Sequence, residues 1–217
     1  MFNVKYNSQR NNYEWGGNLP ASIQCFYTAC IMFLSFFNKK YESYEYEKYY
    51  VDYTEAMVGS PGIAEEVPGW SGRSGAWYIV HQAALERLLP GKKIIWDIEL
   101  DPDSLIQALQ FSPVVYGTIE IGNLAGGHII LVLGYDKDKD EFIVHDPFGD
   151  ATTNYKDTNG AYKRYPRWYL RRYFSGHAIY SAPKVFGIAG KSGVKKKLFH
   201  LQDLPLQESE SISSTSL

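Results

Sequence analysis

Cys25 is the residue of this 217-residue chain whose type and position best suit covalent chemistry. Hydrolysis by a cysteine needs a thiolate, a base that holds a proton near neutral pH, a group that orients the base, and donors for the oxyanion. Ser22 precedes an apolar run, Ile23 to Phe37, and this pattern predicts a helix that begins near Ile23. Cys25 would then lie in the first helical turn, where the partial positive charge of the helix end favours a thiolate.

The second cysteine, Cys30, lies deeper in the same predicted helix, beside Ile31 and Met32. This position is typical of an ordinary buried thiol. Two residues five apart on a helix point in different directions, so no disulfide between Cys25 and Cys30 is expected. Cys25 is therefore the favoured nucleophile.

Five histidines are candidates for the base: His81, His128, His145, His177 and His200. His128 stands out because it follows Gly126 and Gly127 and begins the apolar run Ile129 to Leu133. A histidine at the start of a strand is held rigidly and can still face a cleft. A histidine with satisfied hydrogen bonds at a sheet edge fits this position alone equally well.

Asp146 is the candidate for the group that orients the base. The runs from His128 to Tyr135 and from Glu141 to His145 read as two strands joined by a tight turn, so the start of one lies beside the end of the other. This register places Asp146 near His128. His145 and Asp146 point to opposite faces of the strand, and a carboxylate better stabilises the imidazolium that forms beside a thiolate.

The oxyanion donor is open from the residues alone. Gln9 lies in the segment before the first helix and can fold back over the thiol. Gln24 is adjacent to Cys25 and is expected to point elsewhere on the helix. Either glutamine alone is also consistent with an ordinary surface residue.

The elements that must position these residues are helices first and strands afterwards, which indicates an α+β domain with N-terminal helices packed on an antiparallel sheet. Helices are expected at 23–37, 39–58, 75–89 and 101–110, a long loop at 59–75, and strands at 92–98, 113–121, 128–135, 141–145 and 178–186. Residues 1–189 are interpreted as one domain. Residues 190–217, with a Lys195–Lys197 cluster and a Ser-rich end, are interpreted as a flexible tail or a segment that docks on a protein partner.

The composition excludes several classes of function. A net charge of −2 argues against nucleic-acid binding, and no apolar run is long enough to span a membrane. No phosphate-binding loop, dinucleotide fingerprint or zinc pattern is present, so no cofactor and no metal are expected. The alternating acids Asp136, Asp138 and Asp140 resemble half of a calcium loop, but a solvated hairpin turn is the better interpretation. Residues 1–10 lack a signal peptide, so cytoplasmic synthesis is expected.

Four segments taken together resemble the papain-like cysteine peptidases related to the bacteriocin-processing, double-glycine leader peptidases. In that family a Gln precedes a Cys-Gly-x-Thr helix start, and a Gly-His strand and an Asp-Pro turn follow. The corresponding segments here are Ser8–Asn12, Cys25–Ala29, Gly127–Asp136 and Val144–Gly149. The resemblance covers roughly residues 5–150 and implies a papain-like fold.

The same resemblance implies a role for each of four residues. Cys25 would be the nucleophile, His128 the base, Asp146 the orienting residue and Gln9 the oxyanion donor. One departure is Phe26, which stands where the family often has Gly, and a bulky residue there would narrow the cleft or indicate another substrate.

The function that follows is hydrolysis of peptide or amide bonds. The opening segment looks most like family members found in bacteriophage and bacterial genomes, which indicates peptidoglycan peptides as substrate and a product that is virion-associated or released at lysis. The 18 Tyr, 11 Phe and 5 Trp fit an aromatic-walled groove, although core packing explains them as well. Two alternatives stay open: a catalytically inactive structural or binding module of a phage particle, and a protease that processes one protein partner.

Overall fold

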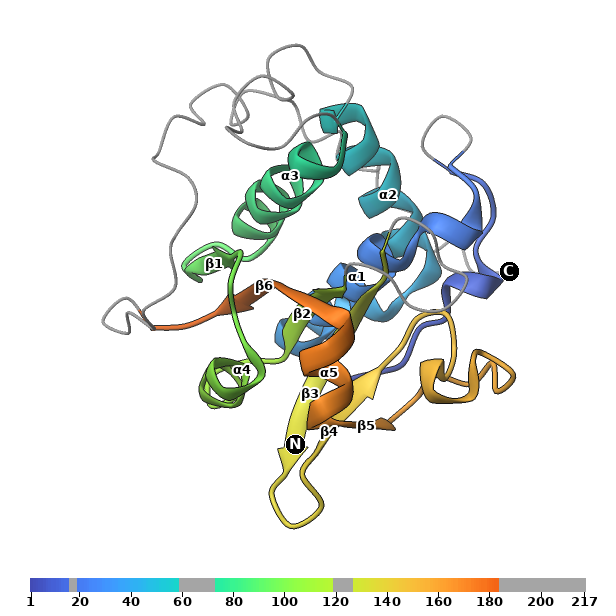
Figure 1. Ribbon diagram of the computed structural model, residues 1–217. Coiled ribbons are helices and arrows are strands. Elements are labelled where there is room, and N and C mark those ends of the chain that lie inside the picture. The colour runs from blue at the N-terminus through green and yellow to red at the C-terminus, as the bar shows by residue number, and fades with distance from the viewer. Residues whose placement is uncertain (16–18, 59–72, 119–126, 184–217) are drawn as a thin grey trace, which may run out of the picture.

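The computed structural model describes residues 1–15, 19–58, 73–118 and 127–183 of the chain (Figure 1). In these ranges the helices are α1 (Cys25–Phe37), α2 (Tyr44–Val58), α3 (Arg73–Leu88), α4 (Pro102–Ala108) and α5 (Arg167–Tyr173). The strands are β1 (Ile94–Asp97), β2 (Val114–Thr118), β3 (Ile129–Asp136), β4 (Glu141–His145), β5 (Lys163–Pro166) and β6 (Phe174–Ser181). Short 3-10 turns occur at Gln9–Asn11, Ala21–Ile23, Lys39–Glu42 and Ala151–Thr153.

The six strands form one antiparallel sheet in the order β1-β6-β2-β3-β4-β5. The hairpin of β3 and β4 pairs Leu131 with His145 and Val132 with Val144, and a bulge follows before Gly134 pairs with Ile143. Within its turn, Asp136 Oδ1 accepts from the N–H groups of Asp138 and Lys139. The predicted hairpin is confirmed, and Asp136 stabilises its turn through these bonds to the backbone.

Two hydrophobic cores lie on opposite faces of the sheet, because alternate residues of each strand point to opposite sides. One face of β3, with Ile129, Leu131 and Leu133, packs in a cluster with the buried residues of α1. The other face, with Ile130 and Val132, packs in a second cluster with residues of α4 and α5. Figure 1 shows α1, α2 and α3 gathered on one side of the sheet and α4 and α5 on the other. The predicted α+β class, with N-terminal helices on an antiparallel sheet, is confirmed.

Helix α1 begins two residues later than the sequence predicts. Residues Ala21–Ile23 form a 3-10 turn, so the helix starts at Cys25, and its N-cap residue is Gln24 rather than Ser22. Helix α4 begins as predicted, because Asp101 caps it through bonds to the N–H groups of Asp103 and Ser104 and Pro102 occupies the first turn. The later start of α1 places Cys25 at the first helical position.

Some elements were missed or shifted, and some predictions fall outside the described residues. Strand β5 and helix α5 were not predicted, and β6 begins at Phe174 rather than Ala178. The tail predicted at 190–217, and most of the loop predicted at 59–75, lie outside the described residues.

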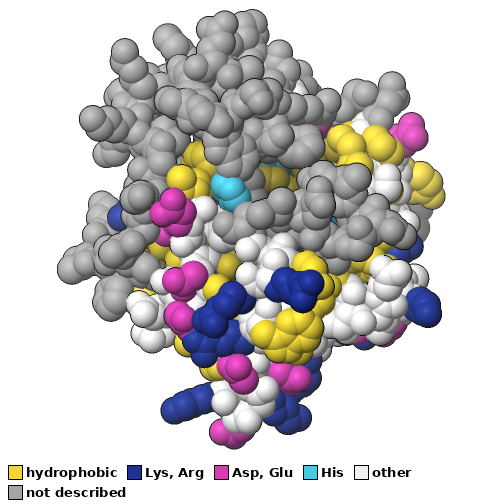
Figure 2. All heavy atoms as spheres, in the orientation of Figure 1, with side chains coloured by type: hydrophobic (Ala, Val, Ile, Leu, Met, Phe, Trp, Pro, Cys, Tyr) yellow, Lys and Arg dark blue, Asp and Glu magenta, His cyan; other side chains and the backbone are white. Residues whose placement is uncertain are grey.

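The described surface carries mixed charges. Figure 2 shows acidic and basic side chains interspersed over the lower half of the face in view. Charged side chains of the described residues form ion pairs, including Arg164 with Asp136 at 2.8 Å and Lys163 with Asp157 at 2.6 Å. Among the described helices, none has the length and apolar character needed to cross a bilayer.

Candidate active site

Cys25 lies at the N-terminus of α1, where the helix leaves the surface for the core. Its side chain is partly exposed, whereas residues 26–35 of the same helix are all buried. Gln24 fixes the entry to the helix, because its buried amide donates to the carbonyl groups of Tyr13 at 2.8 Å and Leu19 at 2.9 Å. The first N–H groups of a helix have no partner inside it, so this end of α1 offers donors beside the sulfur.

His128 directly precedes β3 and is almost fully buried. Gly127 before it has φ +88°, a conformation that glycine adopts without strain. Nε2 of His128 lies 2.6 Å from Asp146 Oδ1, and the Cys25 sulfur lies near enough to the imidazole to raise its pKa. Since Nε2 is occupied by the carboxylate, Nδ1 is the nitrogen left for the sulfur. The structure therefore brings Cys25, His128 and Asp146 into one neighbourhood, with His128 paired to Asp146.

The charge state of His128 depends on these two partners. Burial lowers the pKa of His128, but the Asp146 carboxylate and the Cys25 sulfur together raise it well above its ordinary value. The imidazole is thus held as a cation between two groups that are stabilised by positive charge. This is the arrangement that an acid–base residue paired with a thiolate requires.

Asp146 is completely buried, and donors surround its carboxylate. Oδ1 accepts from His128 and from the Phe148 N–H at 2.9 Å, while Oδ2 accepts from the Tyr165 hydroxyl at 2.6 Å. The neighbouring His145 faces the other way, with Nε2 2.8 Å from the Val4 carbonyl. The opposite orientation predicted for His145 is therefore confirmed. Tyr165 was not predicted, because it comes from β5, a strand that the sequence analysis missed.

Gln9 is buried beside the peptide groups that lead into α1. Its Nε2 donates to the carbonyl oxygens of Ala21 at 3.1 Å and Ser22 at 3.0 Å. These two bonds engage both hydrogens of the amide, and among the described residues Oε1 has no hydrogen-bond partner. In this structure Gln9 braces the segment before Cys25, and its role as an oxyanion donor stays a prediction.

The N-terminal segment holds the turn that carries Asp146. The Gln9 N–H donates to the Pro147 carbonyl at 3.0 Å, and the Ser8 hydroxyl donates to the same oxygen. The Arg10 guanidinium lies 3.8 Å above the Phe148 ring and donates to the Phe148 carbonyl. The Ser-Gln-Arg segment therefore joins the start of the chain to the Asp-Pro-Phe turn.

A buried polar network behind Cys25 was not predicted. Glu47 of α2 accepts from Asn12 at 3.0 Å, from Thr28 of α1 at 2.7 Å and from Asn7 at 3.1 Å. Burial raises the pKa of Glu47, although the three hydrogen bonds oppose this effect. The network joins the N-terminal segment, α1 and α2, and so it fixes the helix that presents the sulfur.

The other candidate nucleophile and histidines lie away from this arrangement. Cys30 is buried, and burial raises the pKa of its thiol far above the ordinary value. Both cysteines are free, which confirms that they form no disulfide. His81 is buried against Phe26, with its Nδ1 2.7 Å from the Tyr50 hydroxyl. His177 is a half-buried residue of β6, and His200 lies outside the described residues.

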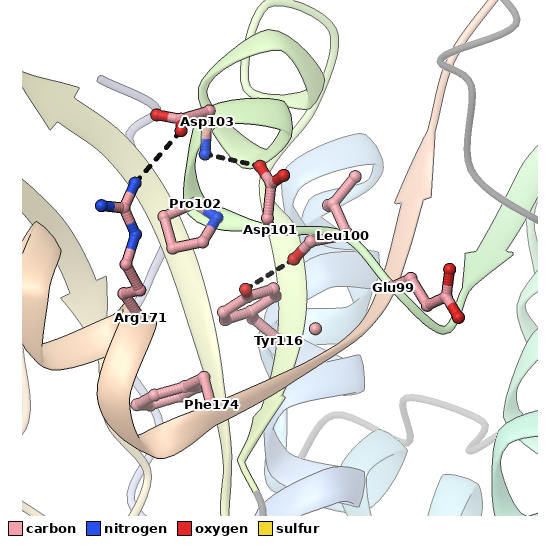
Figure 3. A pocket seen from close by; sticks show the side chains of 9 residues that line it. Glu99, Leu100, Asp101, Pro102, Asp103, Tyr116, Arg171 and Phe174 are labelled. Atoms are coloured by element: carbon pink, nitrogen blue, oxygen red, sulfur yellow. Dashed lines mark hydrogen bonds and ion pairs between the residues drawn. The ribbon is translucent and has the colours of Figure 1, made fainter.

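A cavity of about 330 Å³ lies on the α4 and α5 side of the sheet (Figure 3). Its polar groups bond to one another: Tyr116 donates to the Leu100 carbonyl at 2.6 Å, and Arg171 pairs with Asp103 at 3.1 Å. None of the predicted site residues lines it. Within the described residues, no three His, Cys, Asp or Glu side chains are arranged to hold a metal ion.

A helix that begins at a cysteine, packed on an antiparallel sheet that carries a buried histidine and its carboxylate partner, defines a papain-like fold. A family model described as the Peptidase_C39 like family matches residues 1–175. The chain therefore belongs to this family, and the resemblance to the double-glycine leader peptidases is confirmed. No curated protein matches the chain.

Proposed function

We propose that this protein is a cysteine hydrolase that cleaves peptide or amide bonds. The observation that carries the proposal is the buried His128–Asp146 pair, with the partly exposed Cys25 at the start of α1 near the imidazole. The roles follow from position: Cys25 attacks, His128 carries the proton, and Asp146 keeps the imidazole aligned and charged. Membership of a peptidase-related family supports the same assignment.

The reaction has two stages. The Cys25 thiolate attacks the substrate carbonyl carbon, a C–S bond forms, and the carbonyl electron pair moves to oxygen. As the oxyanion collapses, the C–N bond breaks and His128 gives its proton to the departing amine. A water molecule then attacks the thioester and passes a proton to His128, and the acid leaves as the thiolate is restored.

The oxyanion formed in each stage needs donors in place beforehand. The Cys25 N–H at the start of α1 is one, because it lacks a partner inside the helix. We assign Gln9 as a second donor, following the family resemblance. This role requires its amide to release one of the two carbonyls, Ala21 or Ser22, that it contacts in this structure.

For the substrate we propose bacterial cell-wall peptides, cleaved by a phage product that is carried in the virion or released at lysis. The Ser8–Asn12 opening motivates this choice. An exposed aromatic ring also lies before Cys25 in the chain: Tyr13 is 73% exposed, and it meets the half-exposed ring of Tyr44, at the start of α2, edge to face. Such surfaces suit chains of sugars and peptides.

Substitution of the nucleophile tests the mechanism. Cys25→Ala should abolish turnover of peptide substrates and leave the melting temperature close to that of the native protein. Cys30→Ala, five residues along the same helix, is the matched control and should keep its activity because Cys30 is buried away from His128. Undiminished hydrolysis by Cys25→Ala would rule out the mechanism.

The substrate proposal has a separate test. Purified bacterial cell walls are incubated with the native protein and with Cys25→Ala, and new amino termini are counted by amine labelling. The native protein alone should release them. If it cleaves soluble peptides but releases no amines from walls, the wall substrate is wrong and processing of a protein partner becomes the better account. If it cleaves neither, while iodoacetamide labels Cys25 only at pH values typical of a free thiol, the chain is an inactive module.

A further inference from the structure

Tyr155 lies against the catalytic histidine without having any part in the mechanism above. It follows the 3-10 turn Ala151–Thr153, and its ring meets the His128 ring edge to face, with centroids 5.8 Å apart. The Tyr155 ring also meets the Phe148 ring edge to face, with centroids 5.1 Å apart. The Phe148 ring in turn meets the His128 ring edge to face, with centroids 6.4 Å apart. Two aromatic rings thus form a wall beside the imidazole, and one of them carries a hydroxyl.

The hydroxyl of Tyr155 is buried, and it has no hydrogen-bond partner in the described part of the chain. Burial raises its pKa above the ordinary range, and the nearby charges of Asp146, Tyr169 and Cys25 add to this effect. The group therefore stays protonated and can act only as a neutral donor or acceptor. A buried donor without an acceptor is rare in folded proteins and calls for an explanation such as a ligand.

The backbone at Tyr155 is also unusual. Its φ is +60°, and φ of Asn154 is +55°, so two successive residues adopt the left-handed conformation. A bulky aromatic residue seldom does so, and such outliers gather at functional sites. The Tyr155 N–H donates to the Asp150 carbonyl at 2.9 Å, which holds the turn in place. The fold thus maintains an unfavourable conformation that keeps this ring next to His128.

Apart from the N–H groups at the start of α1, few of the described residues offer a free donor for an oxyanion. Both amide hydrogens of Gln9 are engaged by the carbonyls of Ala21 and Ser22. The Tyr155 hydroxyl is uncommitted, and the ring that carries it lies against His128, the residue that works with Cys25 in the proposed mechanism. We propose that Tyr155 is a further catalytic residue, whose hydroxyl donates a hydrogen bond to the substrate carbonyl oxygen as Cys25 attacks. This inference rests on the proposed function.

The step involves no transfer of the phenolic proton. The C–S bond forms, the carbonyl electron pair moves to oxygen, and the Tyr155 O–H shortens its hydrogen bond to the growing negative charge. When the oxyanion collapses, the pair returns to the C–O bond and the C–N bond breaks, with its proton supplied by His128. Tyr155 is unchanged at the end of each stage.

Tyr155→Phe isolates the hydroxyl because the ring and its contacts stay. The variant should lose about 100-fold in kcat with KM nearly unchanged, as expected for one oxyanion donor. Its melting temperature should not fall, because the hydroxyl has no partner in the folded protein. Tyr162→Phe is the matched control: Tyr162 also has positive φ, but its hydroxyl donates to Asn3 and Val4, so kcat should stay unchanged.

Two chemical probes separate this inference from the proposed function. Iodoacetamide alkylates Cys25 without forming an oxyanion, so native protein and Tyr155→Phe should react at equal rates. A peptide aldehyde forms a hemithioacetal whose oxygen occupies the oxyanion position, so Tyr155→Phe should bind it at least about 10-fold more weakly.

The outcomes are distinct. A native protein that cleaves peptides, together with a Tyr155→Phe variant of unchanged kcat and aldehyde affinity, overturns the role of Tyr155 and leaves the cysteine mechanism intact. A loss of both iodoacetamide reactivity and activity in the variant also overturns it, because the hydroxyl would then act by positioning His128 or Cys25 and not by binding the oxyanion. A native protein that neither cleaves peptides nor binds the aldehyde overturns the proposed function itself.

Discussion

The imidazole of His128 lies 2.6 Å from the carboxylate of Asp146, and both side chains are shut off from solvent. Asp146 is the strongest influence that raises the pKa of His128. Asp146→Asn should therefore lower that pKa, so that the cationic imidazole is lost at a lower pH. We expect kcat to fall by about 100-fold to 10,000-fold and the alkaline limb of the pH–rate profile to move to lower pH. Measured pH profiles of kcat/KM for the two proteins test this, and an unmoved alkaline limb would contradict it.

Gly160 should tolerate no side chain. Its carbonyl accepts from the Asp146 N–H at 2.9 Å, and a Cβ at this position would lie 1.8 Å from the Asp146 carbonyl oxygen. Gly160→Ala must displace the Asp146 turn, so we expect a loss of about 2–3 kcal/mol in the free energy of unfolding together with loss of activity. Urea denaturation and a peptide assay measure both effects.

Gly91→Ala is the control for that substitution. Gly91 has φ +84°, but no atom lies within 4 Å of the Cβ that alanine would add. Backbone strain alone should lower the free energy of unfolding of Gly91→Ala by about 1 kcal/mol, and the activity should stay intact. If Gly160→Ala and Gly91→Ala lowered activity equally, displacement of the Asp146 turn would not explain the loss of activity in Gly160→Ala.

His81 should make the protein sensitive to acid. Burial lowers the pKa of His81 from 6.5 to about 3, so the folded state keeps it neutral while the unfolded state takes up a proton below about pH 6.5. Its contribution to stability is complete above that pH and is lost as the pH falls toward 3, by about 1.4 kcal/mol per pH unit. Between pH 6.5 and 5.0 the native protein should therefore lose about 2 kcal/mol more than His81→Gln. Urea denaturation at the two pH values measures this difference in the free energy of unfolding. Equal losses in the native protein and in His81→Gln would show that His81 is not the source of the acid sensitivity.

Glu47 should stabilise the helix that presents Cys25. Glu47→Gln replaces one acceptor oxygen by an NH₂ group, so one of its partners, Asn7, Asn12 or Thr28, loses an acceptor in a buried site. We expect a loss of about 1–3 kcal/mol in the free energy of unfolding. Glu45→Gln is the matched control on the exposed side of α2 and should change stability by less than about 0.5 kcal/mol. A similar loss in both variants would show that the network contributes nothing.

The sequence predicts those parts of the site that depend on local pattern. Cys25 at a helix start and a hairpin that brings His128 beside Asp146 both follow from short segments with clear periodicity. Tyr165 and Tyr155 could not be found in this way, because they approach the site from a region without a strong pattern. Strand β5 is a four-residue edge strand that ends in Pro166, and α5 is a seven-residue helix without a side-chain cap.

The Glu47 network escaped prediction for a related reason. Glu47 lies in a segment rich in Tyr, Glu and Lys, where a solvated face is the ordinary expectation. Its burial depends on Asn12 and Thr28, which approach from two other segments. The contacts of Gln9 and Asn12 likewise depend on where the N-terminal segment packs against α1 and α2. Local sequence patterns do not predict this packing.

The hydrogen bond from the Tyr6 hydroxyl to the Asp146 carbonyl joins residues 140 positions apart. Closing so long a loop is slow compared with forming a helix or a hairpin, so this junction belongs to the last steps of folding. A chain still emerging from the ribosome can form α1, the helix that begins at Cys25. It still lacks the Asp146 carboxylate and the Tyr165 hydroxyl that donates to it. The proposed hydrolysis therefore requires that synthesis has passed Asp146 and that the Tyr6–Asp146 junction has closed.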